Sequence, residues 1–186
     1  MEFKELTTER LRLVEMTDGY IDDYFHILSR DEVTKYIGMP SLTHRDQADG
    51  MIQTFKEQFK SEKAIRWGIL LSEEEKFIGT VGLSHLSLWG RKAEIGYELH
   101  PGYWKRGLIT EAVAHVLTYA FEELGLFRVG AVTFPANTPS SRVLEKTGFL
   151  REGLLRGYLF QNGENHHAYM YSILRTEFSK RQSRDV

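Results

Sequence analysis

The sequence predicts a single mixed α/β domain over residues 1–186. Short apolar or alternating segments, typical of strands, are interspersed with longer segments whose apolar residues recur at helical spacing. Glycine, proline and asparagine lie between these segments, where turns are expected. No internal repeat, low-complexity tract or linker divides the chain, and its length suits one domain.

The first half of the chain predicts a strand, two helices and then three strands. Residues 10–14 alternate between polar and apolar, as a half-buried strand does. Apolar residues at helical spacing follow around 20–28 and 48–59. Thr43 is expected to cap the second helix, with Asp46 completing a capping box. The three strands are expected at 67–71, 77–83 and 93–99.

The second half predicts a long helix, a strand, a short helix and two strands. An apolar stripe over 108–124 indicates a helix that ends at Gly125. Residues 129–134 are nearly all apolar, as in a strand covered on both faces. Thr138 as N-cap and Pro139 after it predict the start of the short helix. Two strands joined by an Asn-Gly turn are expected at 153–160 and 168–174. The basic tail that follows, 175–186, is expected to fray.

The composition excludes several classes of function. The chain has no cysteine, so disulfides, thiolate metal sites and a cysteine nucleophile are ruled out. A net charge of -2 gives no general attraction to nucleic acid or to an anionic membrane, and neither partner is expected. We expect no signal peptide, because residues 1–9 are polar, and no membrane span, because no run approaches about 20 apolar residues. The cytoplasm is therefore the expected compartment.

The most informative segment runs from Ala93 to Ala112. In it a strand ends, a loop with two glycines and two cations follows, and a long helix begins. The first amides of a helix have no intrahelical partner and carry partial positive charge, so they suit a pyrophosphate. Lys105 and Arg106 add full charges, and Gly107 allows close approach of a ligand. The segment indicates an anion-binding loop. The simpler alternative is an ordinary turn with two solvated cations.

Four segments, in order along the chain, resemble the GNAT superfamily of acetyltransferases, and especially its ribosomal-protein (RimJ/RimL-like) group. They are residues 93–112 for the coenzyme A motif, 8–13 for the opening strand, 137–149 for the second signature, and Asn162-Gly163 with His166 and Tyr171 for the closing hairpin. The resemblance covers essentially the whole chain. It implies a GNAT fold, in which a mixed, mostly antiparallel sheet of about seven strands carries helices on both faces. It also implies that coenzyme A binds where two central parallel strands splay.

Three positions depart from the family pattern. Trp104 stands where the loop usually begins with Gln or Arg, although Trp is common in the RimJ/RimL-like group. Ile109 stands where Gly or Ala is usual, but a β-branched residue still permits helical backbone angles and keeps its amide. His167 stands where relatives often carry Asp, so no catalytic or binding role for an acidic residue is expected at that position.

The resemblance also implies the co-substrate and its contacts. Acetyl-CoA is expected to be the acetyl donor, with coenzyme A as the product. Asn137 is expected to hydrogen-bond the pantetheine arm; its simpler role is that of a turn residue ahead of a helix. The expected cofactor-binding residues are Leu99, Lys105, Arg106, Gly107, Leu108, Ile109, Thr110, Asn137 and Ser140.

Direct attack of an amine on a thioester requires a base, an oxyanion donor and a donor to the leaving thiolate. Glu94 and Glu98 share one face of a strand and are the candidate bases; either is alternatively a structural carboxylate paired with a cation. The family signature implies that Ser140 donates to the thiolate, and its alternative role is helix capping. A backbone amide between residues 94 and 99 is the expected oxyanion donor.

Three functions stay open on the sequence. The first is an N-acetyltransferase acting on a protein N-terminal amine, with a ribosomal protein as a partner. The second acts on a small amine such as a polyamine, an amino acid or a drug. The third is a catalytically silent acetyl-CoA-binding regulator, against which an intact Glu94, Asn137 and Ser140 argue. A monomer and a homodimer are both compatible with the sequence.

Several other side chains have both a structural and a functional interpretation. Some aromatic side chains either line an acceptor pocket or belong to the helical stripes: Tyr20, Tyr24, Phe25 and Trp89. Strand tyrosines either supply a proton or pack: Tyr158, Tyr169 and Tyr171. His166 and His167 are adjacent, but a pair without a third ligand at metal spacing predicts no metal site.

Overall fold

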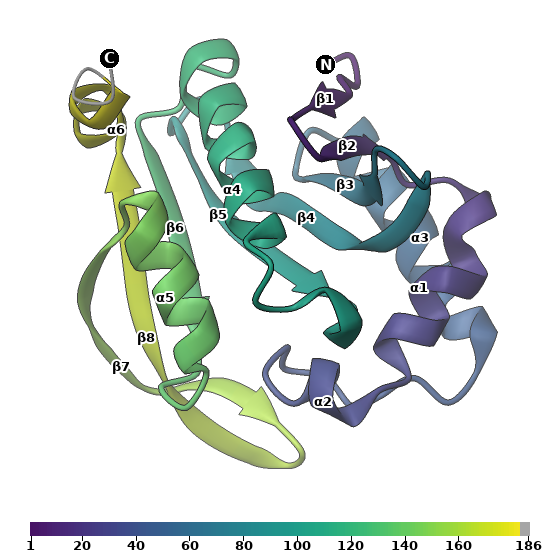
Figure 1. The fold of residues 1–186 in the computed structure, drawn as a ribbon. Helices are drawn as coiled ribbons and strands as arrows, with labels where there is room; N and C mark the ends of the chain where they lie inside the picture. The colour runs from purple at the N-terminus through teal and green to yellow at the C-terminus, as the bar shows by residue number, and fades with distance from the viewer. Residues whose placement is uncertain (183–186) are drawn as a thin grey trace.

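A central sheet of eight strands organises residues 1–182, the part of the chain that the computed structural model describes (Figure 1). Its strands lie in the order β1-β2-β3-β4-β5-β6-β8-β7. Every neighbouring pair in this sheet is antiparallel except β5 and β6, which are parallel. The strands are β1 (Leu6–Thr7), β2 (Leu11–Glu15), β3 (Ile65–Leu71), β4 (Lys76–Ser87), β5 (Lys92–Leu99), β6 (Arg128–Thr133), β7 (Leu150–Gln161) and β8 (Glu164–Leu174).

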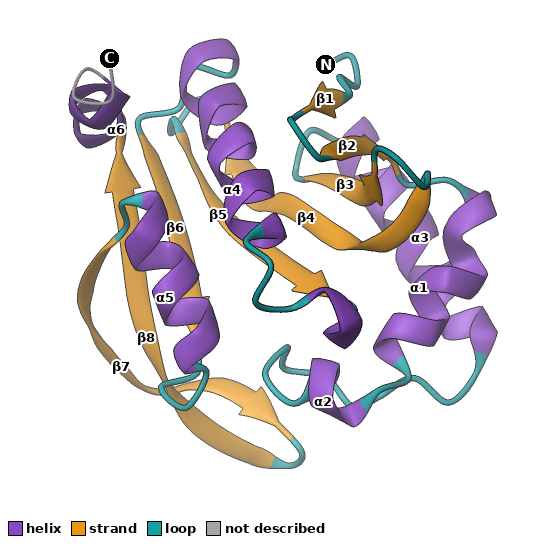
Figure 2. Ribbon diagram, viewed as in Figure 1, coloured by secondary structure: helices purple, strands orange, loops and turns teal. Residues whose placement is uncertain are grey.

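Helices cover both faces of the sheet (Figure 2). The α-helices are α1 (Ile21–Leu28), α2 (Asp31–Thr34), α3 (Arg45–Lys60), α4 (Leu108–Thr118), α5 (Thr138–Thr147) and α6 (Arg175–Gln182). Helices α1 and α3 pack on one face, and α4 and α5 lie side by side on the other (Figure 1). None of the helices within residues 1–182 has the length and apolar character needed to cross a membrane.

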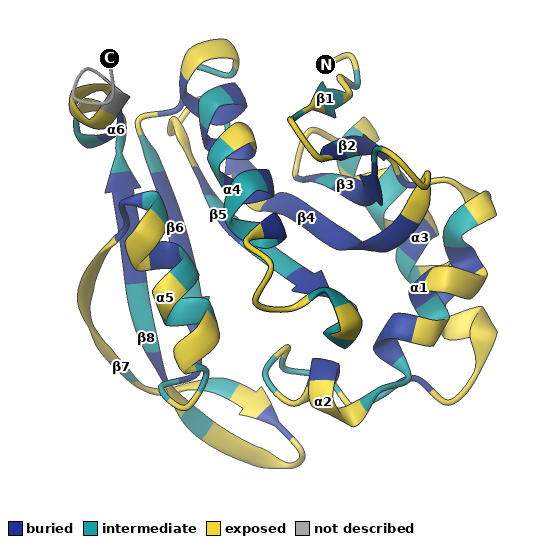
Figure 3. Cartoon of the chain, viewed as in Figure 1, coloured by how far each residue is buried: buried dark blue, intermediate teal, exposed yellow. Residues whose placement is uncertain are grey.

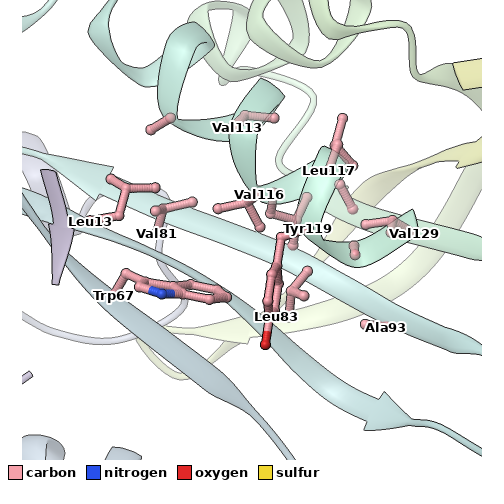
Figure 4. Packing of buried hydrophobic residues seen from close by; sticks show 14 of the residues in the cluster. Leu13, Trp67, Val81, Leu83, Ala93, Val113, Val116, Leu117, Tyr119 and Val129 are labelled. Atoms are coloured by element: carbon pink, nitrogen blue, oxygen red, sulfur yellow. The ribbon is translucent and has the colours of Figure 1, made fainter. Parts of the chain in front are cut away.

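Two apolar cores lie on opposite faces of the sheet, and β3 contributes to both. Its Trp67 and Ile69 join the larger core, in which Val113 and Val116 of α4 pack onto the sheet (Figure 4). Leu70, the residue after Ile69, points the other way into the core under α1 and α3. Burying a side chain of this size contributes about 1.5–3 kcal/mol. The run of apolar residues in β3 follows from this double coverage.

The apolar stripe predicted over 108–124 forms α4 and a π-helical turn, Tyr119–Glu123, that continues it. The amide of Leu124 donates to the carbonyl of Tyr119 at 3.1 Å. Gly125 follows with φ +64°, a left-handed conformation that an L-residue adopts only at a cost. The predicted C-terminal end at Gly125 is thus confirmed.

The cap predicted for α3 lies one residue too early. The N-cap is His44 rather than Thr43, and Gln47 takes the third helical position in place of Asp46. The Gln47 side-chain oxygen accepts from the amides of Thr43 at 2.8 Å and His44 at 2.9 Å. The glutamine side chain is longer than that of the expected aspartate, and its amide oxygen reaches two N–H groups at the start of the helix.

Two further expectations need correction. The sheet has eight strands rather than about seven, because β1 is only two residues long and too short to show an alternating pattern. The segment expected to fray from Arg175 begins with α6, and Phe178 packs against Phe121 with ring centroids 5.1 Å apart. Residues 183–186 of that tail lie outside the described residues.

Candidate active site

The two parallel strands separate soon after they meet. β5 and β6 pair at three positions, of which Glu94 with Gly130 is the last. Beyond it, residues 95–99 of β5 pair with β4 alone and residues 131–133 of β6 pair with β8 alone. We call this divergence the splay. It leaves backbone groups of one β5 edge without a strand beside them.

The direction of the β5 amides follows from the hydrogen bond that ends the strand. The amide of His100 donates to the carbonyl of Ile78 on β4 at 2.8 Å. Because successive residues of a strand point their N–H groups to opposite edges, the amides of Ile95, Tyr97 and Leu99 point into the splay. The candidates for the oxyanion donor, expected to be a backbone amide between residues 94 and 99, are thereby reduced to these three amides.

The loop after β5 is folded by contacts among its own residues. The His100 ring accepts a hydrogen bond from the Gly102 amide at its Nδ1, 3.1 Å away. Trp104, which departs from the family pattern, donates from its indole nitrogen to the Leu99 carbonyl at 2.7 Å. The indole thus ties the loop back onto the end of β5, a contact that the residue type alone did not predict.

The loop ends in a left-handed turn that opens α4. Lys105 and Gly107 have φ values of +60° and +79°, and Gly107 is the N-cap. The first helical hydrogen bond runs from the Glu111 amide to the Gly107 carbonyl at 3.1 Å, so the amides of residues 108–110 have no partner within the helix. Lys105, Arg106 and Gly107 are exposed, whereas Leu108 is buried. Leu108 therefore anchors the turn and offers only its amide.

The connection between β1 and β2 braces the same turn. Arg10 forms an ion pair with Glu111, 2.6 Å between Nη2 and Oε2, and its Nη1 donates to the Arg106 carbonyl at 3.0 Å. Thr8 donates its hydroxyl to Glu111 as well. Burial acts to raise the pKa of Glu111, but the hydrogen bonds from Thr8 and Arg10 outweigh it and lower the pKa. Arg10 and Glu111 lie 101 positions apart, and no sequence signal linked them.

The N-terminus of α5 lies across from β5. Its cap is Asn137 rather than the predicted Thr138, and the Asn137 side-chain oxygen accepts from the Ser140 amide at 3.3 Å. The Ser140 hydroxyl oxygen lies 2.9 Å from the Tyr97 hydroxyl oxygen. Burial raises the pKa of Tyr97 to about 12, and the hydrogen bond with Ser140 opposes part of that rise. The sequence alone did not point to Tyr97. The available signal was its place on the strand next to Glu98, which puts its side chain on the opposite face of the sheet just ahead of the loop.

Glu98 is enclosed in a buried polar network. It is 7% exposed and pairs with the guanidinium of Arg66. It also accepts hydrogen bonds from Thr80 and, at 3.1 Å, from the hydroxyl of Tyr24 on α1. Burial first, and then the charge of Glu98, raise the pKa of Tyr24 well above its ordinary range. The carboxylate oxygens of Glu98 are thus already occupied by protein donors.

Glu94 lies in a different environment on the same strand. It is the last β5 residue paired with β6, and its side chain is 31% exposed. Its Oε2 lies 3.4 Å from Nδ1 of His85, a ring that is largely exposed. Glu94 therefore lies where the strands part and stays open to water.

The remaining candidates do not gather at the splay. Tyr24 is buried in the core under α1, Tyr20 stacks on Phe77 at 5.1 Å, and Trp89 is 98% exposed. They do not form a common pocket with Phe25, which contradicts the pocket interpretation. Tyr171 is buried, and Tyr158 is exposed. Tyr169 is partly buried, and its ring centroid lies 6.5 Å from that of Tyr171.

The two histidines of the closing hairpin each contact backbone. His167 accepts from the Gly157 amide at 3.0 Å, and the His166 ring lies 3.3 Å from the Gln161 carbonyl. Within residues 1–182 no three His, Cys, Asp or Glu side chains converge in the way a metal site requires.

A wall of distant segments lies near the end of β6. It consists of residues 31–41, which include α2, and residues 156–166 of the β7–β8 hairpin; we call it the hairpin wall. The buried Gln161 side chain donates to the carbonyls of Thr34 at 2.9 Å and Met39 at 3.2 Å. Two surface recesses lie along this wall. Their lining residues are Asp31, Glu32, Thr34, Lys35, Met39, Pro40, Ser41, Gln161 and Asn162 for one, and Phe134, Pro135, Ala136, Asn165, His166 and His167 for the other.

Comparison with known proteins identifies close relatives. YoaA of Bacillus subtilis (strain 168), an uncharacterized N-acetyltransferase, is 42% identical over 173 residues, which cover 93% of this chain and 98% of YoaA. The ribosomal protein uS5-alanine N-acetyltransferase of Escherichia coli (strain K12) is 30% identical over 172 residues, 86% of this chain and 84% of that protein. The solved structure of spermidine N-acetyltransferase from Vibrio cholerae, in complex with CoA and spermine, has the same fold. Its TM-score is 0.81 at 19% identity, over 92% of this chain and 99% of that one.

The family described as Acetyltransferase (GNAT) domain matches residues 10–150. This range includes both strands of the splay, the loop between β5 and α4, and the whole of α5. The resemblance to the RimJ/RimL-like group seen in the sequence, and the GNAT fold expected from it, are confirmed. The chain therefore belongs to the GNAT family and is an acetyl-CoA-dependent N-acetyltransferase.

Proposed function

We propose that this enzyme transfers the acetyl group of acetyl-CoA to the N-terminal α-amine of a protein, by direct attack in a ternary complex. The observation that carries the transfer is the splay, where one unpaired edge of β5 leads into the first turn of α4. The protein acceptor is supported by the 30% identity to the ribosomal protein uS5-alanine N-acetyltransferase.

The cofactor lies along β5 and ends at α4 in this proposal. The pyrophosphate accepts from the amides of residues 108–110, where Lys105 and Arg106 add positive charge. The pantetheine arm runs in the splay, where the amides of Tyr97 and Leu99 point, as an added strand would. Asn137 borders the arm from the α5 side. The backbone amides and the two cations thus offer hydrogen-bond donors to the phosphate and carbonyl oxygens of the cofactor.

The reaction needs no covalent enzyme intermediate. The amine nitrogen adds to the thioester carbonyl carbon while a proton leaves the nitrogen. The carbon–sulfur bond then breaks, and its electron pair stays on sulfur. A β5 amide that points into the splay stabilises the charge on the carbonyl oxygen. Ser140 donates a hydrogen bond to the departing thiolate.

Of the two carboxylates on β5, Glu94 is the better proton acceptor in this scheme. Glu98 is buried and accepts hydrogen bonds from Arg66, Thr80 and Tyr24. To take the proton of the amine, its carboxylate would have to give up one of these hydrogen bonds. Glu94 is partly exposed at the point where the strands part, and it accepts the amine proton directly or through water.

Glu94→Gln tests this assignment. The variant should lose about a hundredfold in kcat near neutral pH and regain part of it at high pH, where free amine is abundant. Affinity for acetyl-CoA should stay unchanged, because the residue does not touch the proposed cofactor contacts. An unaltered pH–rate profile in this variant would move the base elsewhere.

An acceptor comparison tests the proposed function itself. Short peptides with a free N-terminal amine should consume the thioester, whereas the same peptides with a blocked N-terminus and an internal lysine should not. A polyamine is the second candidate, supported by the spermidine N-acetyltransferase that shares the fold. Faster turnover of spermidine than of every peptide would replace the first proposal with the second. A silent acetyl-CoA binder would consume no thioester with any acceptor.

A further inference from the structure

A pair of hydroxyl groups joins β5 to α5 across the splay. Tyr97 comes from the strand and Ser140 from the first turn of the helix, 43 residues later. Their oxygens are 2.9 Å apart, and the Tyr97 hydroxyl also lies within 3.3 Å of the Ser140 carbonyl oxygen. The Tyr97 ring packs against the larger core, so its hydroxyl is held by a rigid base.

Each hydroxyl has one hydrogen to give and two lone pairs to offer. When Tyr97 donates to the Ser140 carbonyl, the Ser140 hydroxyl is free to donate to Tyr97. When Tyr97 donates to the Ser140 hydroxyl oxygen, the Ser140 hydrogen must turn to another acceptor. The pair thus has two arrangements, and an anion near Ser140 favours the second because it supplies that acceptor.

We propose that Tyr97 is a positioning residue that turns the Ser140 hydroxyl hydrogen toward the leaving sulfur of coenzyme A. The inference rests on the proposed role of Ser140 in acetyl transfer. As the carbon–sulfur bond breaks, its electron pair remains on sulfur. Ser140 donates a hydrogen bond to that sulfur, and Tyr97 donates one to Ser140. Neither residue loses its proton, and no bond to either residue forms.

The choice of Tyr97 among the tyrosines follows from its contacts. Tyr169 lies on the same face of the sheet, but its ring contacts are to Tyr171 and to the guanidinium of Arg151. The raised pKa of Tyr97 keeps its hydroxyl protonated and able to donate throughout the neutral range. A donor polarises the hydroxyl that it bonds to, which strengthens the donation from Ser140.

Tyr97→Phe removes the hydroxyl and keeps the ring. We expect kcat to fall about threefold to tenfold, against about tenfold to a hundredfold for Ser140→Ala, whose hydrogen bond reaches a charged group. In the double variant the loss should equal that of Ser140→Ala alone, because Tyr97 acts through Ser140. Tyr169→Phe is the matched control and should keep the wild-type rate. Thermal unfolding of each variant checks that it folds.

A second measurement follows the thiolate without catalysis. The pH dependence of alkylation of enzyme-bound coenzyme A reports the acidity of its thiol. The thiol should be more acidic on the wild-type enzyme than on Tyr97→Phe or Ser140→Ala. Equal acidity on all three, or multiplicative losses of kcat in the double variant, would overturn the inference. If the wild-type enzyme transfers no acetyl to any amine, the proposed function fails, and the thiol titration still decides the role of Tyr97.

Discussion

Strands β4 and β7 belong to one sheet, have the same length of 12 residues, and differ almost completely in burial (Figure 3). β7 carries at least as many large apolar side chains as β4. Yet Ile78 and Val81 of β4 are 0% exposed, whereas Leu150 and Phe160 of β7 are 59% and 63% exposed. β4 is central and has helices on both faces, and β7 is the last strand. Position in the sheet, rather than composition, decides burial here.

The central strands and β7 have different roles in the molecule. The central strands form a close-packed base for the loop between β5 and α4, where the proposed cofactor contacts lie. The pairing of β7 with β8 has two register shifts, at 151–153 and 155–159, which bend β7 and limit pairing with another chain. Its tip forms part of the hairpin wall, held to residues 31–41 by polar contacts such as those of Gln161. We expect changes in the centre to cost stability. The wall lines a recess just beyond the end of β6, one of the two strands of the splay, so we expect changes there to alter binding of the acceptor.

The largest effect is expected from Glu98→Gln in the centre. The neutral amide leaves the partly buried guanidinium of Arg66 without the counter-charge of the buried Glu98, which typically costs about 3 kcal/mol in the free energy of unfolding. The melting temperature should fall by about 6–12 °C for a chain of this length. Glu94→Gln, on the same strand and partly exposed, is the matched control and should change stability by less than about 0.5 kcal/mol. Equal losses in both variants would contradict the central role of the Glu98 network.

At the boundary between the two regions, Gly107→Val should raise the Kd for acetyl-CoA about tenfold. A left-handed φ costs an L-residue roughly 1–2 kcal/mol, and the new side chain covers the approach to the α4 amides. Within the protein, the added Cβ meets only ordinary contact, 3.5 Å from Arg10 Nη2.

Gly125→Val provides the matched control for backbone strain. Gly125 has a similar φ of +64°, with no atom within 4 Å of an added Cβ, and it lies beyond the far end of the helix. It should lose comparable stability and bind acetyl-CoA normally. Isothermal titration calorimetry measures both affinities. Unchanged affinity in Gly107→Val would remove the loop from the proposed cofactor site.

At the hairpin wall, Gln161→Glu should raise the KM for the amine acceptor about fivefold and leave the Kd for acetyl-CoA unchanged. A carboxylate offers no hydrogen to the carbonyls of Thr34 and Met39, and each loses a bond worth about 1 kcal/mol. Asn162→Asp, the exposed neighbour, controls for the added charge. Steady-state kinetics with the acceptor varied checks this split. A change in cofactor affinity alone would show that the wall does not border the acceptor.

The smallest effect is expected from Glu152→Gln on β7. Hydrogen bonds from Arg128 and Ser172 lower the pKa of Glu152 from 4.5 to about 2. A depressed folded-state pKa stabilises the protein above pH 4.5, and this contribution is lost as the pH falls toward 2. The side chain is 43% exposed, so the difference from wild type at pH 7 should stay below about 1 kcal/mol. Denaturant titrations at pH 7 and near pH 2 should show this difference shrink; a constant difference would exclude the ion pair as its source.

Local patterns in the sequence were enough to predict the class of fold and the loop between β5 and α4. Alternation and helical spacing are local properties, so nearly every central strand and helix follows from them. The change from strand to glycine-containing loop to helix at 93–112 is also local, and it indicates an anion site before any tertiary contact is known. Its resemblance to the coenzyme A motif identified the family, which the matching family and relatives confirmed.

Which side chains meet cannot be read from local patterns and depends on how the elements pack. Glu94 and Glu98 are equivalent in sequence, and the chain folds one into a network with Arg66 and leaves the other at the splay. The meeting of Tyr97 with Ser140 likewise depends on how α5 docks beside β5. These contacts join residues that are tens of positions apart, so register and sheet order must be settled before the partners can be known. The same reason explains why composition did not predict that β7 is exposed: local pattern specifies which faces of an element are apolar, and only packing decides whether another element covers them.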